Sequence, residues 1–167
     1  MTETMPTDET TKPDKKTHPR FNHIAMSLPA DRLDAAGRQE ILDFYGDVFG
    51  WVELPTETVD RKTLVMMAYE FGQFVFLHAS KKPLQADRGD HFGMSVSSMD
   101  DLDAFLAKAK TWQARDARVE IIDKHVEDFG VLRLHSFYLT HLLPMMIEIQ
   151  YFELVEGGTY NAKTPSS

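Results

Sequence analysis

Two stretches of the chain share one alternation of apolar positions with polar or small ones. Residues 22–28 are Asn-His-Ile-Ala-Met-Ser-Leu, and residues 90–96 are Asp-His-Phe-Gly-Met-Ser-Val. A period of two predicts a strand with two different faces. In both stretches one face is apolar and the other carries a histidine followed by small residues. The pattern therefore predicts two equivalent strands, with His23 and His91 at equivalent places.

The pattern that follows each strand is also repeated. Apolar residues with helical spacing come next, from Ile41 to Phe49 before Gly50, and from Leu102 to Ala109 after a Ser98 N-cap. Each helix is followed by three strand candidates, near residues 51–57, 62–69 and 73–79, and near 117–123, 131–140 and 145–152. The chain thus predicts an α+β fold of two βαβββ modules, with a curved eight-stranded mixed sheet and both helices on its outer face.

These modules cover about residues 21–80 and 90–153, within one domain spanning 21–155. Residues 1–20 are polar and are expected to form a disordered arm, and residues 156–167 a flexible tail. The net charge of −8 argues against nucleic-acid binding, and the absence of cysteine excludes disulfides and thiolate metal sites. With no apolar run long enough for a membrane span and no secretion signal, a cytoplasmic protein is expected.

The last strand candidate supplies a possible third partner for the two histidines. Glu148 lies between Ile147 and Ile149, and a buried carboxylate is costly unless it is neutralised, paired or bound to a cation. Two imidazoles and one carboxylate can hold a divalent ion and leave positions open for substrate and O₂ or water. We therefore predict that His23, His91 and Glu148 bind a metal, with Fe(II) favoured and Mn, Ni, Zn or Co possible.

The spacing leaves simpler interpretations open. The three residues lie 68 and 57 positions apart, so the duplication rather than a local motif connects them. A single strand histidine is more often a hydrogen-bonded structural residue, and Glu148 alone could pair with a lysine or arginine.

The repeated pattern resembles the vicinal oxygen chelate superfamily, which includes glyoxalase I, methylmalonyl-CoA epimerase, extradiol dioxygenases and bleomycin resistance protein. The resemblance spans residues 21–153 and rests on Asn22 to Ala25, Phe44 to Trp51, Asp90 to Gly93, and Ile147-Glu148. It implies a divalent metal and a small-molecule substrate that is aromatic or chelates through oxygen. By analogy it also implies a homodimer, in which a site lies within one chain or between two.

Residues 137–148 are similar to the extradiol dioxygenase signature, with Tyr138 ten positions before Glu148 and Pro144 at the turn. The resemblance departs from that signature at His141-Leu142, and Phe129 and Gly130 lie where its upstream histidine belongs. It implies that Tyr138 hydrogen-bonds a metal-bound oxygen, with His78 or His141 as candidate catalytic residues for proton transfer. The simpler alternatives are a core aromatic for Tyr138 and a surface turn residue for His141.

Three functions remain open. The first is an extradiol-type dioxygenase that cleaves a catecholic molecule with Fe(II) and O₂. The second is a metal-dependent lyase or isomerase of the glyoxalase or epimerase type, which usually has a fourth ligand where this chain has Phe76. The third is a metal-free protein that binds a small molecule and so confers resistance.

Overall fold

The computed structural model describes residues 19–155 and contains two modules of the same order. Residues 1–18 of the expected arm, and the expected tail at 156–167, lie outside the described residues. The first module consists of β1 (His23–Leu28), a 3₁₀ turn (Ala30–Leu33), α1 (Ala35–Phe49), β2 (Val52–Glu53), β3 (Thr63–Met67) and β4 (Phe74–Ala79). The second consists of β5 (His91–Ser95), α2 (Met99–Gln113), β6 (Glu120–Asp128), β7 (Leu132–Thr140) and β8 (Met146–Leu154).

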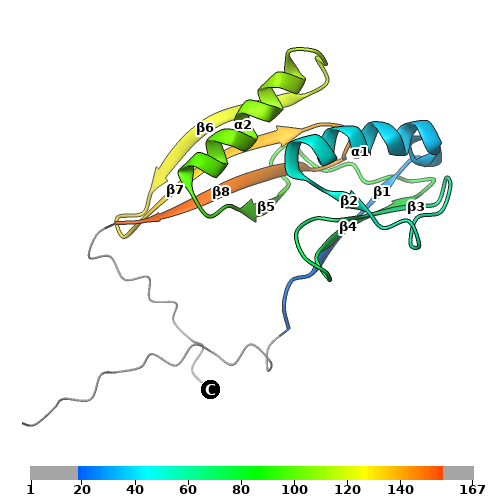
Figure 1. Cartoon of the computed structure of the whole chain (residues 1–167), viewed down its shortest axis with the longest axis horizontal. Coiled ribbons are helices and arrows are strands. Elements are labelled where there is room, and N and C mark those ends of the chain that lie inside the picture. The colour runs from blue at the N-terminus through cyan, green and yellow to red at the C-terminus, as the bar shows by residue number, and fades with distance from the viewer. Residues whose placement is uncertain (1–18, 156–167) are drawn as a thin grey trace, which may run out of the picture.

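The predicted α+β fold with two βαβββ modules is confirmed. Its eight strands form two four-stranded mixed sheets, ordered β1-β4-β3-β2 and β5-β8-β7-β6. Each sheet begins with a parallel pair, β1 with β4 and β5 with β8, and continues antiparallel. Figure 1 shows the two sheets extending away from each other, with α1 over the first sheet and α2 along the second, both on the same side.

Some element boundaries differ from those predicted. The strand expected at 51–57 shortens to Val52–Glu53, because Pro55 follows and removes a backbone donor. The strand expected at 117–123 starts later and extends to Asp128. Helix α1 ends as predicted at Gly50, whose φ of 74° lies in the left-handed region.

One face of each sheet belongs to a single apolar core shared by both modules. It receives Met26 and Leu28 from β1 and Ile147 and Ile149 from β8, together with buried residues of both helices. The opposite face of each sheet, here called the open face, carries the other residues of the alternation. His23 and His91 both lie on open faces, as the period of two predicted.

The modules are joined through α1. Glu40 of α1 pairs with Arg118 at 2.5 Å, and the Trp112 indole N–H of α2 donates to Asp47 at 2.7 Å. The Tyr45 hydroxyl donates to the His141 carbonyl at 2.5 Å. Among residues 19–155, neither helix is long and apolar enough to cross a membrane.

Candidate metal centre

The second module brings two of the predicted ligands together. Strand β5 pairs in parallel with β8 so that Gly93 is opposite Glu148, and the His91 imidazole Nε2 lies 3.3 Å from Glu148 Oε2. Glu148 is only 3% exposed, whereas His91 reaches solvent. Across the described residues, His91 is the only basic side chain within ion-pair distance of this carboxylate.

Hydrogen bonds fix both groups. His91 Nδ1 lies 2.9 Å from the Gly89 carbonyl oxygen, which can only accept, so Nδ1 carries a hydrogen. The Gln150 amide donates to Glu148 Oε2 at 2.6 Å. A neutral His91 would then have an Nε2 lone pair on an atom 3.3 Å from a carboxylate oxygen. Two acceptors at this distance repel unless a positive charge, either a proton or a metal ion, lies between them.

Gly93 leaves the space that the Gln150 amide occupies. A Cβ added at Gly93 would lie 3.3 Å from Gln150 Oε1, which is closer than ordinary van der Waals contact. The small residue at position 93 therefore leaves room for Gln150, whose amide holds Glu148 in place. Gln150 could have been identified from the sequence, because alternation places it on the same face as Glu148.

Tyr138 lies beside this pair, directly opposite Glu148 across the β7–β8 ladder. Its ring meets the His91 ring edge to face, with centroids 5.2 Å apart. Desolvation raises the pKa of Tyr138 to about 12, with a further contribution from the hydrogen bond and negative charge of Glu148. At neutral pH its hydroxyl is therefore protonated and can donate a hydrogen bond.

His23 lies on the other sheet. Its Nδ1 is 2.9 Å from the Asn22 side-chain oxygen, and its ring stacks on Phe74 with centroids 4.7 Å apart. In the described part of one chain, no group of three or more His, Asp or Glu side chains is placed to hold a metal ion. His91 and Glu148 thus converge within one chain, and the ligand role of His23 stays a prediction.

The first module lacks a carboxylate at the place of Glu148. In β1 and β4, Ala25 is opposite Phe76, as Gly93 is opposite Glu148 in β5 and β8. The register thus places Phe76 at the equivalent strand position. His78, a candidate for proton transfer, is on the same open face two residues further along β4, with its ring 5.9 Å from that of Phe76.

His141 is not the surface turn residue that the sequence favoured. It is 1% exposed, its ring centroid is 4.3 Å from that of Phe44, and neither ring nitrogen has a hydrogen-bond partner among residues 19–155. Burial lowers its pKa, an effect that Asp116, 3.8 Å from Nε2, partly offsets. Because it is enclosed between the modules, away from Glu148, we do not retain it as a catalytic residue.

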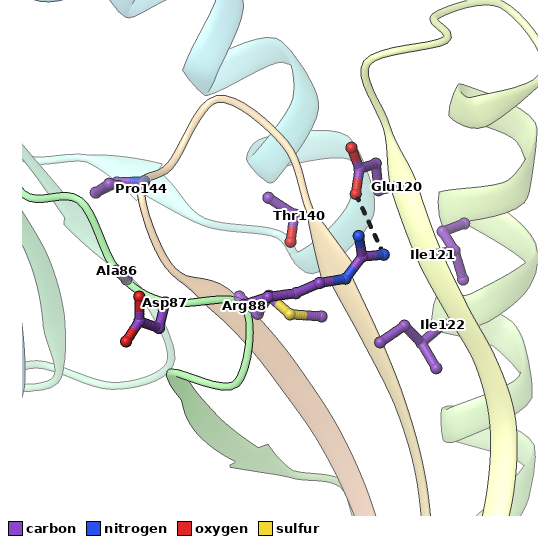
Figure 2. A pocket seen from close by; sticks show the side chains of 9 residues that line it. Ala86, Asp87, Arg88, Glu120, Ile121, Ile122, Thr140 and Pro144 are labelled. Atoms are coloured by element: carbon purple, nitrogen blue, oxygen red, sulfur yellow. Dashed lines mark ion pairs between the residues drawn. The ribbon is translucent and has the colours of Figure 1, made fainter.

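A small cavity lies beyond Tyr138 on the side of the linker between the modules. It has a volume of about 150 Å³ and is lined by residues that include Arg88, Glu120, Ile122, Thr140 and Met146. Figure 2 shows Arg88 extending from the linker toward Glu120 of β6, and the two charged groups approach to 3.9 Å. Ile122 is opposite Tyr138 and Met146 is opposite His91, so the cavity adjoins the candidate site.

No family model matches the chain, and neither does any curated protein. Solved structures do match in fold. The fosfomycin resistance protein FosX from Listeria monocytogenes has a TM-score of 0.54 and 13% identity over 80% of this chain and 93% of its own. A glyoxalase family protein from Bacillus anthracis has a TM-score of 0.56 and 18% identity, covering 80% and 94%.

A glyoxalase/bleomycin resistance protein from Albidiferax ferrireducens has a TM-score of 0.54 and 14% identity, covering 78% of this chain and 97% of its own. At such identities these matches concern the fold. They show that the chain shares the fold of these glyoxalase and resistance proteins, which is the fold that the resemblance in the sequence implied.

Proposed function

We propose that the chain is a divalent-metal enzyme that acts on a small molecule chelating through two oxygens. The observation that supports it most directly is the opposition of His91 Nε2 and Glu148 Oε2 at 3.3 Å, both held by other hydrogen bonds. A nitrogen and a carboxylate oxygen suit Fe(II), Mn, Ni, Zn or Co, and a cation there would relieve the repulsion between them.

We further propose that the third ligand is His23 of a second copy in a homodimer. His23 lies on β1 and His91 on β5, and each of these is an edge strand of its sheet in the described chain. Edge strands carry backbone groups that a neighbouring chain can approach. A twofold axis that brings β1 of one copy beside β5 of the other would form two equivalent sites, each with both histidines and Glu148.

For the reaction, we favour extradiol-type dioxygenation of a catecholic substrate. A bound Fe(II) would supply Lewis-acid activation of the two substrate oxygens and a place for O₂. Tyr138, protonated at neutral pH, would donate a hydrogen bond to a substrate oxygen beside Glu148. Its spacing of ten residues from Glu148 and the apolar Phe76 at the fourth-ligand position support this choice over an isomerase. His78 remains a candidate for proton transfer only if the partner's sheet approaches the site.

The alternative is redox-neutral metal chemistry, as in a lyase, isomerase or hydrolase. A FosX mutant structure holds Mn(II) with 1S,2S-dihydroxypropylphosphonic acid, a vicinal diol, on this fold with a TM-score of 0.54 and 16% identity. If this chain is a lyase, isomerase or hydrolase, that structure favours Mn(II) as its metal. A metal-free binding protein would have no use for a buried carboxylate facing an imidazole.

Anaerobic reconstitution with Fe(II), Mn(II), Ni(II) or Zn(II), followed by measurement of bound metal, tests the proposal. We expect one metal ion per chain, with O₂ uptake and a yellow ring-cleavage product when catechols are added to the Fe(II) form. Metal binding without O₂ uptake would favour the lyase, isomerase or hydrolase alternative. The absence of bound metal would overturn the enzyme proposal and leave a binding protein.

A further inference from the structure

A β-bulge in β6 brings another histidine to the candidate site. The β6–β7 ladder shifts between Ile122, opposite Tyr138, and His125, opposite Ser136, so three steps along β6 match two along β7. An extra residue in one strand redirects the side chains that follow it. His125 therefore lies on the same face as Tyr138, although strict alternation from Ile122 would place it on the helix side.

Contacts with α2 explain why the bulge forms there. Asp123 accepts from Lys110 at 2.7 Å, and the next residue, Lys124, pairs with Asp103. Two consecutive side chains reach the same helix, which a regular strand does not allow because its side chains alternate between faces. The pairs with α2 thus stabilise the bulge, and the bulge turns His125 toward the open face.

On that face His125 packs against Tyr138. The two rings are nearly parallel, at 10°, with centroids 5.7 Å apart, and His125 Nε2 lies 3.5 Å from the hydroxyl of the buried Ser136. His91, whose strand lies on the other side of β7 from β6 in the sheet order, meets the Tyr138 ring edge to face. The phenol ring is therefore held between two imidazoles, with Glu148 opposite it.

We propose that His125 is a positioning residue of the candidate metal site, which holds the Tyr138 ring so that its hydroxyl stays beside Glu148. The expected effect on metal affinity rests on the proposed function, because groups that orient a metal ligand alter the affinity of the site for its metal. It concerns the stacked ring and not the charge of His125.

The first test needs no metal. Fluorotyrosine incorporated at the five tyrosines gives ¹⁹F resonances, of which the one for Tyr138 is identified by its loss in Tyr138→Phe. We expect His125→Ala to shift and broaden this resonance. His125→Phe, which keeps a flat ring, should leave the line narrow, and His135→Ala on the other face of the sheet should leave it unchanged. An unaltered Tyr138 resonance in His125→Ala would overturn the proposal.

The second test is Mn(II) affinity. We expect His125→Ala to weaken binding by about 10-fold, the same order as Tyr138→Phe, with His125→Phe within about twofold of wild type. The double variant should be no weaker than Tyr138→Phe alone. A full additional loss in the double variant would show that His125 acts independently of Tyr138 and would contradict the proposal. Failure of the wild-type protein to bind Fe(II), Mn(II), Ni(II) and Zn(II) alike would reject the proposed function, while the ¹⁹F comparison would still decide whether His125 holds Tyr138.

Discussion

The two modules use the same strand pair in the same register, and they differ in what faces the histidine. In the second module, Gly93 is opposite Glu148, and the carboxylate meets His91. In the first, Ala25 is opposite Phe76, and His23 stacks on the neighbouring Phe74. The second module thus places a buried carboxylate beside its imidazole, whereas the first places an aromatic ring there. Under the proposed function, the two modules supply different parts of one metal site: the second supplies His91 and Glu148, and the first supplies His23.

The largest effect is expected from removing the carboxylate that distinguishes the modules. Glu148→Gln keeps the shape of the side chain and loses the charge, so Mn(II) affinity should fall by about 100-fold or more. Isothermal titration measures this directly. Glu153→Gln is the matched control, since Glu153 lies on the same strand but pairs with His135 on the other face. Equal Mn(II) affinities for wild type and Glu148→Gln would contradict a metal site in the second module.

Adding a carboxylate to the first module should raise the Mn(II) affinity. Phe76→Glu places a carboxylate at the position equivalent to Glu148, and we expect Mn(II) to bind about 10-fold more tightly through a fourth ligand. Phe76→Leu, which keeps the position apolar, should leave the affinity near that of wild type. If Phe76→Glu folds and binds Mn(II) as wild type does, Phe76 does not border the site.

The turns that join the last two strands of each module differ as well. In the first module this turn is exposed, with Phe71 95% accessible, whereas in the second it places His141 in the core against α1. The lowered pKa of His141 means that the unfolded chain takes up a proton more readily than the folded one. The stabilisation is therefore complete above about pH 6.5 and declines as the pH falls toward the folded pKa, by at most about 1.4 kcal/mol per pH unit.

Urea unfolding at a series of pH values tests this expectation. His141→Leu should give a flatter pH dependence of the unfolding free energy between pH 6.5 and 5 than wild type. An identical pH dependence in wild type and His141→Leu would show that the buried imidazole does not couple protons to folding.

The smallest effect on Mn(II) affinity is expected at the small residue two positions after each strand histidine, Gly93 in the second module and Ala25 in the first. Gly93→Ala would push the Gln150 amide away from Glu148, and we expect Mn(II) affinity to fall by about threefold. The matched change in the first module, Ala25→Gly, removes a methyl group opposite Phe76 rather than opposite a carboxylate, and it should not alter the affinity by more than about 1.5-fold. A Gly93→Ala variant that binds as wild type does would show that Gln150 can adjust without releasing Glu148.

The sequence predicted the fold well because duplication doubles each signal. The repeated His-apolar-small-Met-Ser pattern, the helical stripes and the alternation in β8 are local properties, and they predicted that His91 and Glu148 share one face. Tyr138 came from the resemblance to the extradiol dioxygenase signature, and the β7–β8 register places it opposite Glu148. The sequence did not predict the burial of His141 or the face of the sheet on which His125 lies. The burial of His141 depends on packing against α1, a segment almost one hundred residues away. His125 depends on a bulge stabilised by α2, which breaks the alternation used to assign faces.

Mixing two variants that have each lost Mn(II) binding tests most directly whether one metal site is formed by the first module of one copy and the second module of another. His23→Ala and Glu148→Ala should each lose Mn(II) binding alone. After mixing and subunit exchange, half of the dimers should be mixed and each should regain one intact site, so that about one quarter of the wild-type Mn(II) capacity returns. If the mixture binds no more Mn(II) than the separate variants do, the two histidines and Glu148 do not meet across a dimer, and the account is contradicted.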